Sequence, residues 1–371
     1  MALCFLSSAP MKIKLPLPAW TILIPVVAWI LYFYDSSPTG TFLTILLSAA
    51  LIGSVLAAVH HAEVVAHRVG EPFGTLVLAI AITVIEVSLI VSLMLAGGPG
   101  AETYARDTVF AAIMIILTGI IGLCLFVGGI KYREQSFGGF GVSASLIGLI
   151  AIIVLTLVLP NYTVSEVGPV YSNSQMIFVA VVCLILYGSF VAIQTGRHRD
   201  YFLPKGADES REDAHAEPPT LLATWMSLFL LLACLGAVVL IAKSLAPTIE
   251  AGVSNIGAPK SLVGVIVALV ILLPEGMAAV KAARKNRLQT SLNLALGSAM
   301  ASIGLTIPAV AIASIFTGLT VTLGIDMKSI VLLVVSLFTI MISFGSGRTN
   351  VLQGVVLLVI FAVYLFITIV P

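Results

Sequence analysis

Two stretches of the chain decide its fold: FGTLVLAIAITVIEVSLIVSLM at 73–94 and SLVGVIVALVILLPEGMAAVKA at 261–282. Each is apolar over the roughly 20 residues that a membrane-spanning helix needs, and each contains one acidic residue. At 1.5 Å per residue, Glu86 and Glu275 lie roughly 20 Å along their helices, close to the middle of a bilayer. Inserting an acid at that depth costs about 2.5–3.5 kcal/mol, so two of them indicate a function inside the membrane.

The composition extends this interpretation to the whole chain of 371 residues. Apolar residues make up 60% and charged residues only 9%, whereas a soluble domain carries about 25% charged residues. The formal net charge is +1, and no basic stripe is interleaved with aromatic residues, so no nucleic-acid partner is expected. The apolar blocks contain no paired aspartates, Ser/His pair or HExxH helix, so the sequence predicts neither an enzyme nor a bound cofactor.

Apolar blocks of membrane-spanning length recur along the whole chain. Eleven are found, at 17–34, 41–59, 73–96, 108–130, 142–160, 174–195, 220–246, 260–283, 290–316, 327–344 and 350–370. In lipid the backbone must satisfy its own hydrogen bonds, so continuous apolar runs of this length predict helices. The expected fold is therefore an all-α integral membrane protein with about eleven transmembrane helices.

Lysine and arginine in the short loops predict the orientation in the membrane. With a cytoplasmic N-terminus, 14 of the 18 basic residues fall inside and 4 fall outside. The outside set is Arg106, Lys243, Lys260 and Lys328. Eleven spans then place the C-terminus outside, while the N-terminus and the hydrophilic stretch 196–219 are cytoplasmic.

The hydrophilic stretch mixes charges with proline and glycine, which is typical of a flexible linker. Four parts are expected: the N-terminus and first transmembrane helix (1–34), a five-helix repeat (35–195), a cytoplasmic linker (196–219) and a second five-helix repeat (220–371). An odd number of helices per repeat inverts the second repeat relative to the first. Transporters built from inverted repeats bind their substrates near the bilayer midplane, where the repeats meet.

The two buried glutamates occupy the second helix of each predicted repeat, and we expect Glu86 and Glu275 to bind both the cation and protons. Pro274 has no N–H, so the carbonyl of Val270 loses its helical partner and becomes a candidate cation ligand. Five hydroxyl side chains are further candidates if their faces converge: Thr83, Ser88, Ser298, Ser302 and Thr306. The alternatives are that protonated glutamates only bond neighbouring helices, and that the hydroxyls bond to their own helix.

A second polar group lies in HHAEVVAHRVGEPFG at 60–74. In a helix, His60, Glu63 and His67 fall close to one face, at i, i+3 and i+7. Imidazoles titrate near physiological pH, so this segment is a candidate proton relay or pH sensor. Its candidate residues are His60, His61, Glu63, His67 and Glu71. The alternative is an interfacial amphipathic turn, and the HxxE spacing lacks the further ligands that a zinc site needs.

Four segments carry a resemblance to a known family: RVGEPFGTLVLAIAITVIE, LCLFVGG, KNRLQTSLNLALGSAMASIGLTIP and SGRTNVLQG. The likeness runs through nearly the whole chain after the first apolar block. Through these segments the sequence resembles the calcium/proton antiporters of the Ca²⁺/cation antiporter superfamily, in the bacterial ChaA-type branch. The resemblance implies a multi-pass protein of the bacterial inner (plasma) membrane that exchanges a cation for protons.

Related exchangers carry a GNxxE motif in each repeat, and the resemblance places its glutamates at the two positions named above. It implies that both acids bind the cation and protons directly. The motif asparagines are replaced by Thr83 and Leu272, and polar positions of the fourth helix by Ile115 and Ile116. Since Ca²⁺ takes roughly 6–8 oxygen ligands, these departures leave Na⁺ and K⁺ open beside Ca²⁺.

The sequence thus predicts a secondary active transporter that exchanges a cation for protons, with Ca²⁺ as the first candidate and Na⁺ or K⁺ as the next. A monovalent antiporter with little Ca²⁺ transport is the alternative. A passive channel is disfavoured because the helices lack the repeated polar faces of a water-lined pore. The expected partners are inorganic cations, protons and the lipid bilayer, and no oligomeric state is predicted.

Overall fold

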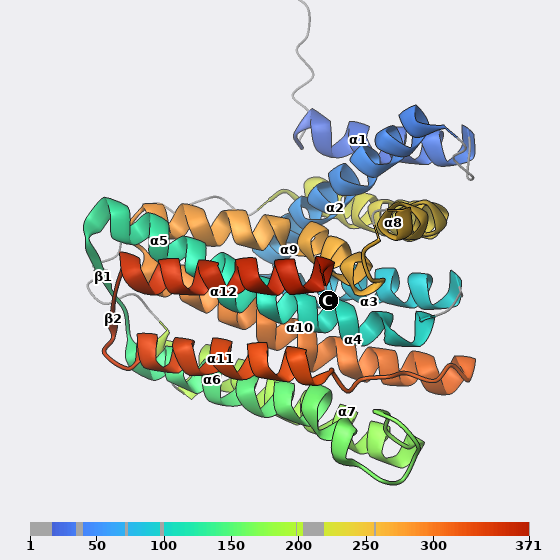
Figure 1. Ribbon diagram of the computed structural model, residues 1–371. Coiled ribbons are helices and arrows are strands. Elements are labelled where there is room, and N and C mark those ends of the chain that lie inside the picture. Colours follow the sequence, from blue (N-terminus) through green and yellow to red (C-terminus); the bar gives the residue numbers. More distant parts are fainter. Residues whose placement is uncertain are drawn as a thin grey trace, which may run out of the picture.

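The computed structural model describes residues 17–34, 40–70, 73–96, 100–197, 199–202, 219–255 and 257–370. The first half contains α1 (Ala19–Tyr34), α2 (Thr41–Val69), α3 (Phe73–Ala96), η1 (Ala101–Thr103), α4 (Tyr104–Met114), η2 (Ile115–Ile120), α5 (Ile121–Tyr132), β1 (Glu134–Ser136), α6 (Gly139–Ile153), η3 (Val154–Val158), η4 (Leu159–Tyr162), α7 (Asn173–Ala192), η5 (Ile193–Arg197) and η6 (Arg199–Tyr201). The second half contains α8 (Leu221–Asn255), α9 (Ser261–Arg284), α10 (Leu288–Thr317), α11 (Met327–Phe344), β2 (Arg348–Asn350) and α12 (Val351–Ile369). The predicted all-α class is confirmed (Figure 1).

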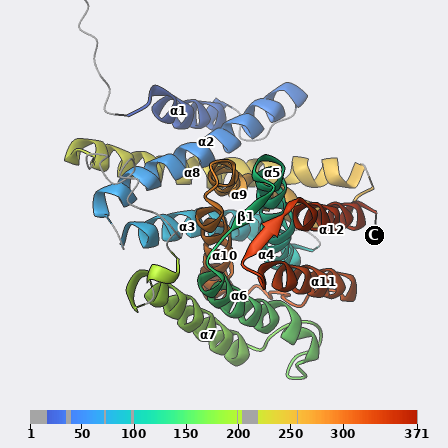
Figure 2. The same cartoon turned by 90° about the vertical axis from the view of Figure 1, so that its left-hand side faces the viewer.

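Ten helical segments of the described chain are long and apolar enough to cross a membrane, which confirms ten of the predicted spans. The remaining predicted span, the first in the chain, corresponds to α1, which is an apolar helix of 16 residues. At 1.5 Å per residue it is about 24 Å long, shorter than the ~30 Å hydrocarbon core. It lies at the edge of the bundle against α2 and α8 (Figure 2), where Trp29 Nε1 donates to the Ala233 carbonyl at 3.0 Å.

One set of helix ends lies at the same face of the molecule, which we call the first face. Hydrogen bonds join these ends and the segments between them. β1 pairs antiparallel with β2, at the left of Figure 1. The Lys131 ammonium donates to the Arg284 carbonyl at 2.9 Å, which joins the ends of α5 and α9. The Asn293 amide donates to the Phe202 carbonyl at 2.5 Å, so the chain leaving the first half meets the start of α10 here.

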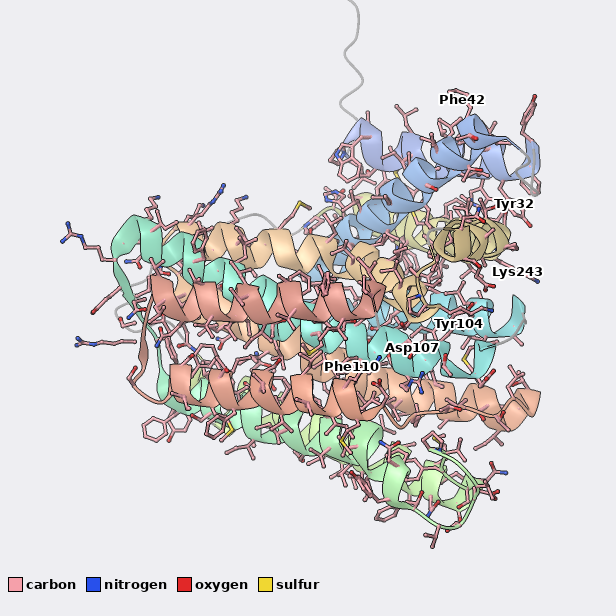
Figure 3. All side chains as sticks on the ribbon, in the orientation of Figure 1. Tyr32, Phe42, Tyr104, Asp107, Phe110 and Lys243 are labelled. Carbon is pink, nitrogen blue, oxygen red and sulfur yellow. The ribbon has the colours of Figure 1, made fainter. Side chains whose placement is uncertain are left out.

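The remaining helix ends gather at the opposite face. The Tyr104 hydroxyl bonds to the Glu250 carboxylate, and Arg106 donates to the Gly324 carbonyl at 3.2 Å. An isolated antiparallel bridge joins Val170 to Thr322. Figure 3 shows Tyr104 toward the end of the bundle opposite β1 and β2. The described segments that these contacts join are thereby assigned to one of two faces without reference to a membrane.

The helix contacts between the two halves occur in matching pairs. The long first helices of the halves, α2 and α8, pack on each other. α3 packs on α10, and the continuous helix α4–η2–α5 packs on α9. α7 packs on α10, and α12 packs on α5. Exchanging the halves maps each of these contacts onto another, as expected for two repeats with one architecture.

Glycines allow the closest of these approaches. A Cβ at Gly354 of α12 would lie 2.4 Å from the backbone nitrogen of Phe126 on α5, and one at Gly129 would lie 2.7 Å from the nitrogen of Val351. A real side chain at either position would therefore force the two helices apart. Small residues serve this purpose at many helix interfaces in membranes, where close backbone contact supplies the attraction.

Two sequence predictions need correction. The second helix ends at Val69 and not at 59, so the histidine segment forms the last turns of α2. The linker does not begin as a flexible segment: Phe202 is buried, and a Cβ at Gly141 would lie only 2.4 Å from the Tyr201 carbonyl oxygen. Its apolar and aromatic residues explain why this end packs on the bundle. The remainder of the predicted linker up to 218 lies outside the described residues.

Candidate functional site

Glu86 is a buried acid in the middle of α3, and its side chain is 3% exposed. Its Oε1 accepts a hydrogen bond of 2.6 Å from the Ser302 hydroxyl on α10. Thr306 lies one turn further along α10, is fully buried, and its hydroxyl has no hydrogen-bond partner among the described residues. The contact between α3 and α10 therefore joins one carboxylate to one hydroxyl and leaves a second hydroxyl available.

Glu275 is the matching acid on α9 and is 8% exposed. Neither of its carboxylate oxygens has a hydrogen-bond partner within the part of the chain that the structure describes. A buried carboxylate without partners is costly, because desolvation removes its water and nothing replaces it. The cost is removed by a proton or by a cation, so the environment of Glu275 favours binding either one.

The two acids lie at similar depths on antiparallel helices. α3 starts beside the end of α2, where Arg68 donates to the Pro219 carbonyl at 3.2 Å, and α9 ends where its Arg284 carbonyl meets α5. From these ends, Glu86 lies about 20 Å and Glu275 about 14 Å into the bundle, at 1.5 Å per residue. α3 and α9 both pack on α10 and also contact each other, which brings the two acids into the same part of the bundle.

An irregular helix faces the Glu275 segment. Residues Ile115–Ile120 form a π-helix between α4 and α5, and this segment packs on α9. A Cβ at Gly276 would lie 3.2 Å from Ile120 Cδ1, so the absence of a side chain there permits the contact. Short π-helical turns inside α-helices are frequent at functional sites. This turn was not predicted from the sequence, although Thr118 and Gly119, two poor helix formers in mid-span, were a signal for it.

The other candidate ligands take different positions. Thr83 is buried one turn before Glu86, while Ser88 and Ser298 are half-buried. No described hydrogen bond joins these three side chains to either glutamate. α9 continues without a break through Pro274. The carbonyl of Val270 therefore lies within a continuous helix, and its role as a ligand stays a prediction.

The histidine segment is divided between two environments. His60 is half-buried, with its ring 5.7 Å from that of Trp20 on α1, and its buried Nε2 has no described partner. His61 is fully buried: Nδ1 lies 3.3 Å from the Ser227 hydroxyl of α8, and Nε2 lies 3.1 Å from the carbonyl oxygen of Thr21. Glu63 and His67 are exposed on α2, and Glu71 lies outside the described residues.

The described residues contain no group of three or more His, Cys, Asp or Glu side chains placed to hold a metal ion. A cation at mid-membrane would therefore take its remaining ligands from hydroxyls, backbone carbonyls and water. Those are the oxygen ligands that hard cations prefer.

Comparisons with known proteins cover nearly the whole chain. The sodium/calcium exchanger protein family matches the chain at residues 39–196 and 226–370, one stretch in each half. The sodium-potassium/proton antiporter ChaA of Escherichia coli is 36% identical over 97% of this chain and 99% of its own length. The putative ionic transporter y4hA of Sinorhizobium fredii is 44% identical over 95% of this chain and 97% of its own length. The solved structure of native YfkE shares the fold, with a TM-score of 0.70 at 20% identity over 95% of this chain and 98% of that one.

The fold and the family together define a multi-pass membrane transporter and not an enzyme. The chain belongs to the sodium/calcium exchanger protein family. Within this family it is a cation/proton antiporter. The predicted resemblance to cation antiporters is thereby confirmed.

Proposed function

We propose that this antiporter exchanges Ca²⁺ for protons at one shared site formed by Glu86 and Glu275. The observation that carries the proposal is the Glu275 carboxylate, which is buried at mid-membrane with both oxygens unpartnered. Glu86, fixed by Ser302, supplies the second negative charge. Two carboxylates balance one divalent cation or two protons, so either cargo leaves the site neutral.

Competition for the same oxygens couples the two fluxes. While both carboxylates hold protons, their charge is cancelled and a cation gains little by entering. When the site opens to the side with the cation, the cation displaces the protons. Rocking of one group of helices against the rest would then expose the site to the other side. We also propose that the two five-helix repeats, 35–195 and 220–371, are related to each other by inversion.

Na⁺ or K⁺ is the second candidate cargo, and three observations favour it. The four carboxylate oxygens and the hydroxyls of Ser302 and Thr306 reach only the lower end of the roughly 6–8 ligands that Ca²⁺ takes. On the α4 side, Ile115 and Ile116 are buried and offer no side-chain oxygen. The Escherichia coli relative is a sodium-potassium/proton antiporter by name and matches over nearly its full length.

The test is exchange in proteoliposomes without ATP, driven by a pH gradient alone. We expect radioactive Ca²⁺ to accumulate above its outside concentration when the lumen is acidic, and this accumulation to collapse when a protonophore removes the gradient. Na⁺ and K⁺ are then added as competitors at equal pH on both sides. Ca²⁺ uptake that moves no protons out of the lumen would indicate a channel and would contradict the proposal.

We propose that the first face, with β1 and β2, is cytoplasmic and that the protein resides in the bacterial plasma membrane. The basic residues of the loops support this orientation, because Lys131, Arg284 and Arg348 all belong to that face. Single cysteines at Lys285 and Glu166 should therefore react with a membrane-impermeant maleimide from opposite sides of the membrane. Labelling at Lys285 only after permeabilisation supports the orientation, and labelling of intact cells there contradicts it.

We propose separate roles for the histidine segment. His61 uses both ring nitrogens to dock α1 and α8 onto α2, whereas His60, Glu63 and His67 stay available to move protons. α2 packs on both α3 and α9, which supports a proton path from α2 toward the site. Glu71 remains a candidate in the same path by its sequence position alone.

A further inference from the structure

An apolar groove lies along α9, at the contact of α9 with the η2–α5 segment and α12. Its volume is about 550 Å³, within the range of about 300–1,000 Å³ typical of ligand pockets. Its walls include Leu269, Leu273 and Met277 of α9, Leu123 of α5 and Leu358 of α12. The side chains of Leu269, Met277 and Leu123 are 51%, 54% and 40% exposed, so the groove opens sideways, toward lipid.

Two glycines, Gly119 and Gly276, line the groove. A Cβ at Gly119 would lie 3.4 Å from the ring of Phe361 on α12, and one at Gly276 would lie 3.2 Å from Ile120 Cδ1. Because even a Cβ would contact a neighbouring side chain, a larger residue at either position would have to extend into the groove.

One end of the groove is basic. Lys281 and Arg284, at the end of α9, complete the lining, and neither side chain has an acidic partner among the described residues. The Arg284 carbonyl is held at 2.9 Å by both Lys131 and Tyr132, which fixes this end of α9 at the first face of the molecule. The side chains of Lys281 and Arg284 thus place two positive charges at the level expected for the membrane surface.

The distances along α9 match one leaflet of a bilayer. Lys281 and Leu269 are twelve residues apart, about 18 Å in an α-helix, against ~15 Å for half of a ~30 Å hydrocarbon core. A phosphate at the basic end would thus leave an acyl chain lying along the apolar wall. Basic pockets between transmembrane helices at the membrane surface bind the headgroups of anionic lipids.

We propose that this groove binds one anionic phospholipid, with its phosphate on Lys281 and Arg284 and an acyl chain over Gly119 and Gly276. Charge complementarity selects an anionic headgroup over a zwitterionic one. The glycines and leucines select a chain over a free phosphate ion. The inference concerns a lipid site beside the transport path and does not depend on which cation is exchanged.

The test is native mass spectrometry of the full-length protein titrated with phosphatidylglycerol or with phosphatidylcholine. We expect one phosphatidylglycerol to bind tightly. Lys281→Gln with Arg284→Gln should weaken its binding about twenty-five-fold, taking each lost basic contact as about fivefold. Lys285→Gln is the matched control, since this neighbouring exposed lysine does not line the groove, and it should bind as wild type does.

A second variant tests the apolar part independently of charge. Gly119→Leu should fill the groove and displace the lipid while both basic residues remain, and size-exclusion chromatography checks that it is folded. Unchanged binding in the double variant, equal binding of phosphatidylcholine, or competition by inorganic phosphate would each overturn the proposal. A second copy of the chain in place of the lipid, seen as a lipid-free dimer, would overturn it as well.

Discussion

Glu86→Gln and Glu275→Gln are each expected to reduce exchange to below about a tenth of the wild-type rate, because an intramembrane acid that carries the cargo has no neutral substitute. The amide keeps the size of the side chain but can neither release a proton nor balance a cation's charge. Glu86 accepts a hydrogen bond from Ser302, and Glu275 has no partner, so neither substitution removes an ion pair on which folding depends. Uptake of Ca²⁺, Na⁺ and K⁺ into proteoliposomes, driven by a proton gradient, measures the effect.

Glu166→Gln is the matched control, because it makes the same substitution at an exposed position outside the described helices. It should transport as wild type does. The variants are compared at equal amounts of monodisperse protein, so that loss of folding is separated from loss of transport. A rate above about a tenth of wild type in either buried variant would contradict shared binding at that residue, since an amide cannot take both of its roles.

Much of this fold can be predicted from the continuous apolar runs of the sequence. Continuous apolar runs predict spans well because lipid leaves the backbone no other way to satisfy its hydrogen bonds. The same reasoning predicted a span at 17–34, and α1 is an apolar helix of 16 residues there. It ended α2 too early, because His60 and His61 interrupt the apolar pattern although the helix continues to Val69.

The site was predictable in part. Depth alone singles out Glu86 and Glu275, since a buried acid is rare enough to be noticed in one sequence. Which hydroxyl meets which acid depends on how α3 and α10 are rotated and packed, and no single-helix pattern contains that information. Ser302 bonds to Glu86, whereas Ser298, four residues earlier, makes no described bond to it. The π-helical turn and the pairing of β1 with β2 likewise arise from contacts between distant segments.

Cation affinity is expected to rise with pH, by about tenfold per pH unit for each proton that the cation displaces, while the empty site is protonated. The sign follows from competition. Low pH keeps protons on the carboxylates and blocks the cation, and high pH removes the competitor. A carboxylate in water would be fully ionised from about pH 6 to 9, so affinity would then be flat, but burial favours its neutral form.

Proteoliposomes clamped to equal pH on both sides give this affinity without a driving gradient. Protons should raise the apparent KM for the cation and leave the maximal rate unchanged at saturating cation. Replacing His60 and His67 together with glutamine separates any contribution of the α2 segment, and the competition should remain in that variant. A maximal rate that falls with acid while KM stays constant would locate the proton effect away from the cation site.

The most direct measurement is proton release on cation binding, made with purified protein in weakly buffered detergent solution and a pH indicator. If Glu86 and Glu275 are shared, adding Ca²⁺, or Na⁺ or K⁺ if one of these is the cargo, should release about one to two protons per bound cation near neutral pH. The Glu86→Gln, Glu275→Gln double variant should release none. Saturable cation binding by the wild type without proton release would contradict a site in which the two cargoes compete for the same carboxylates.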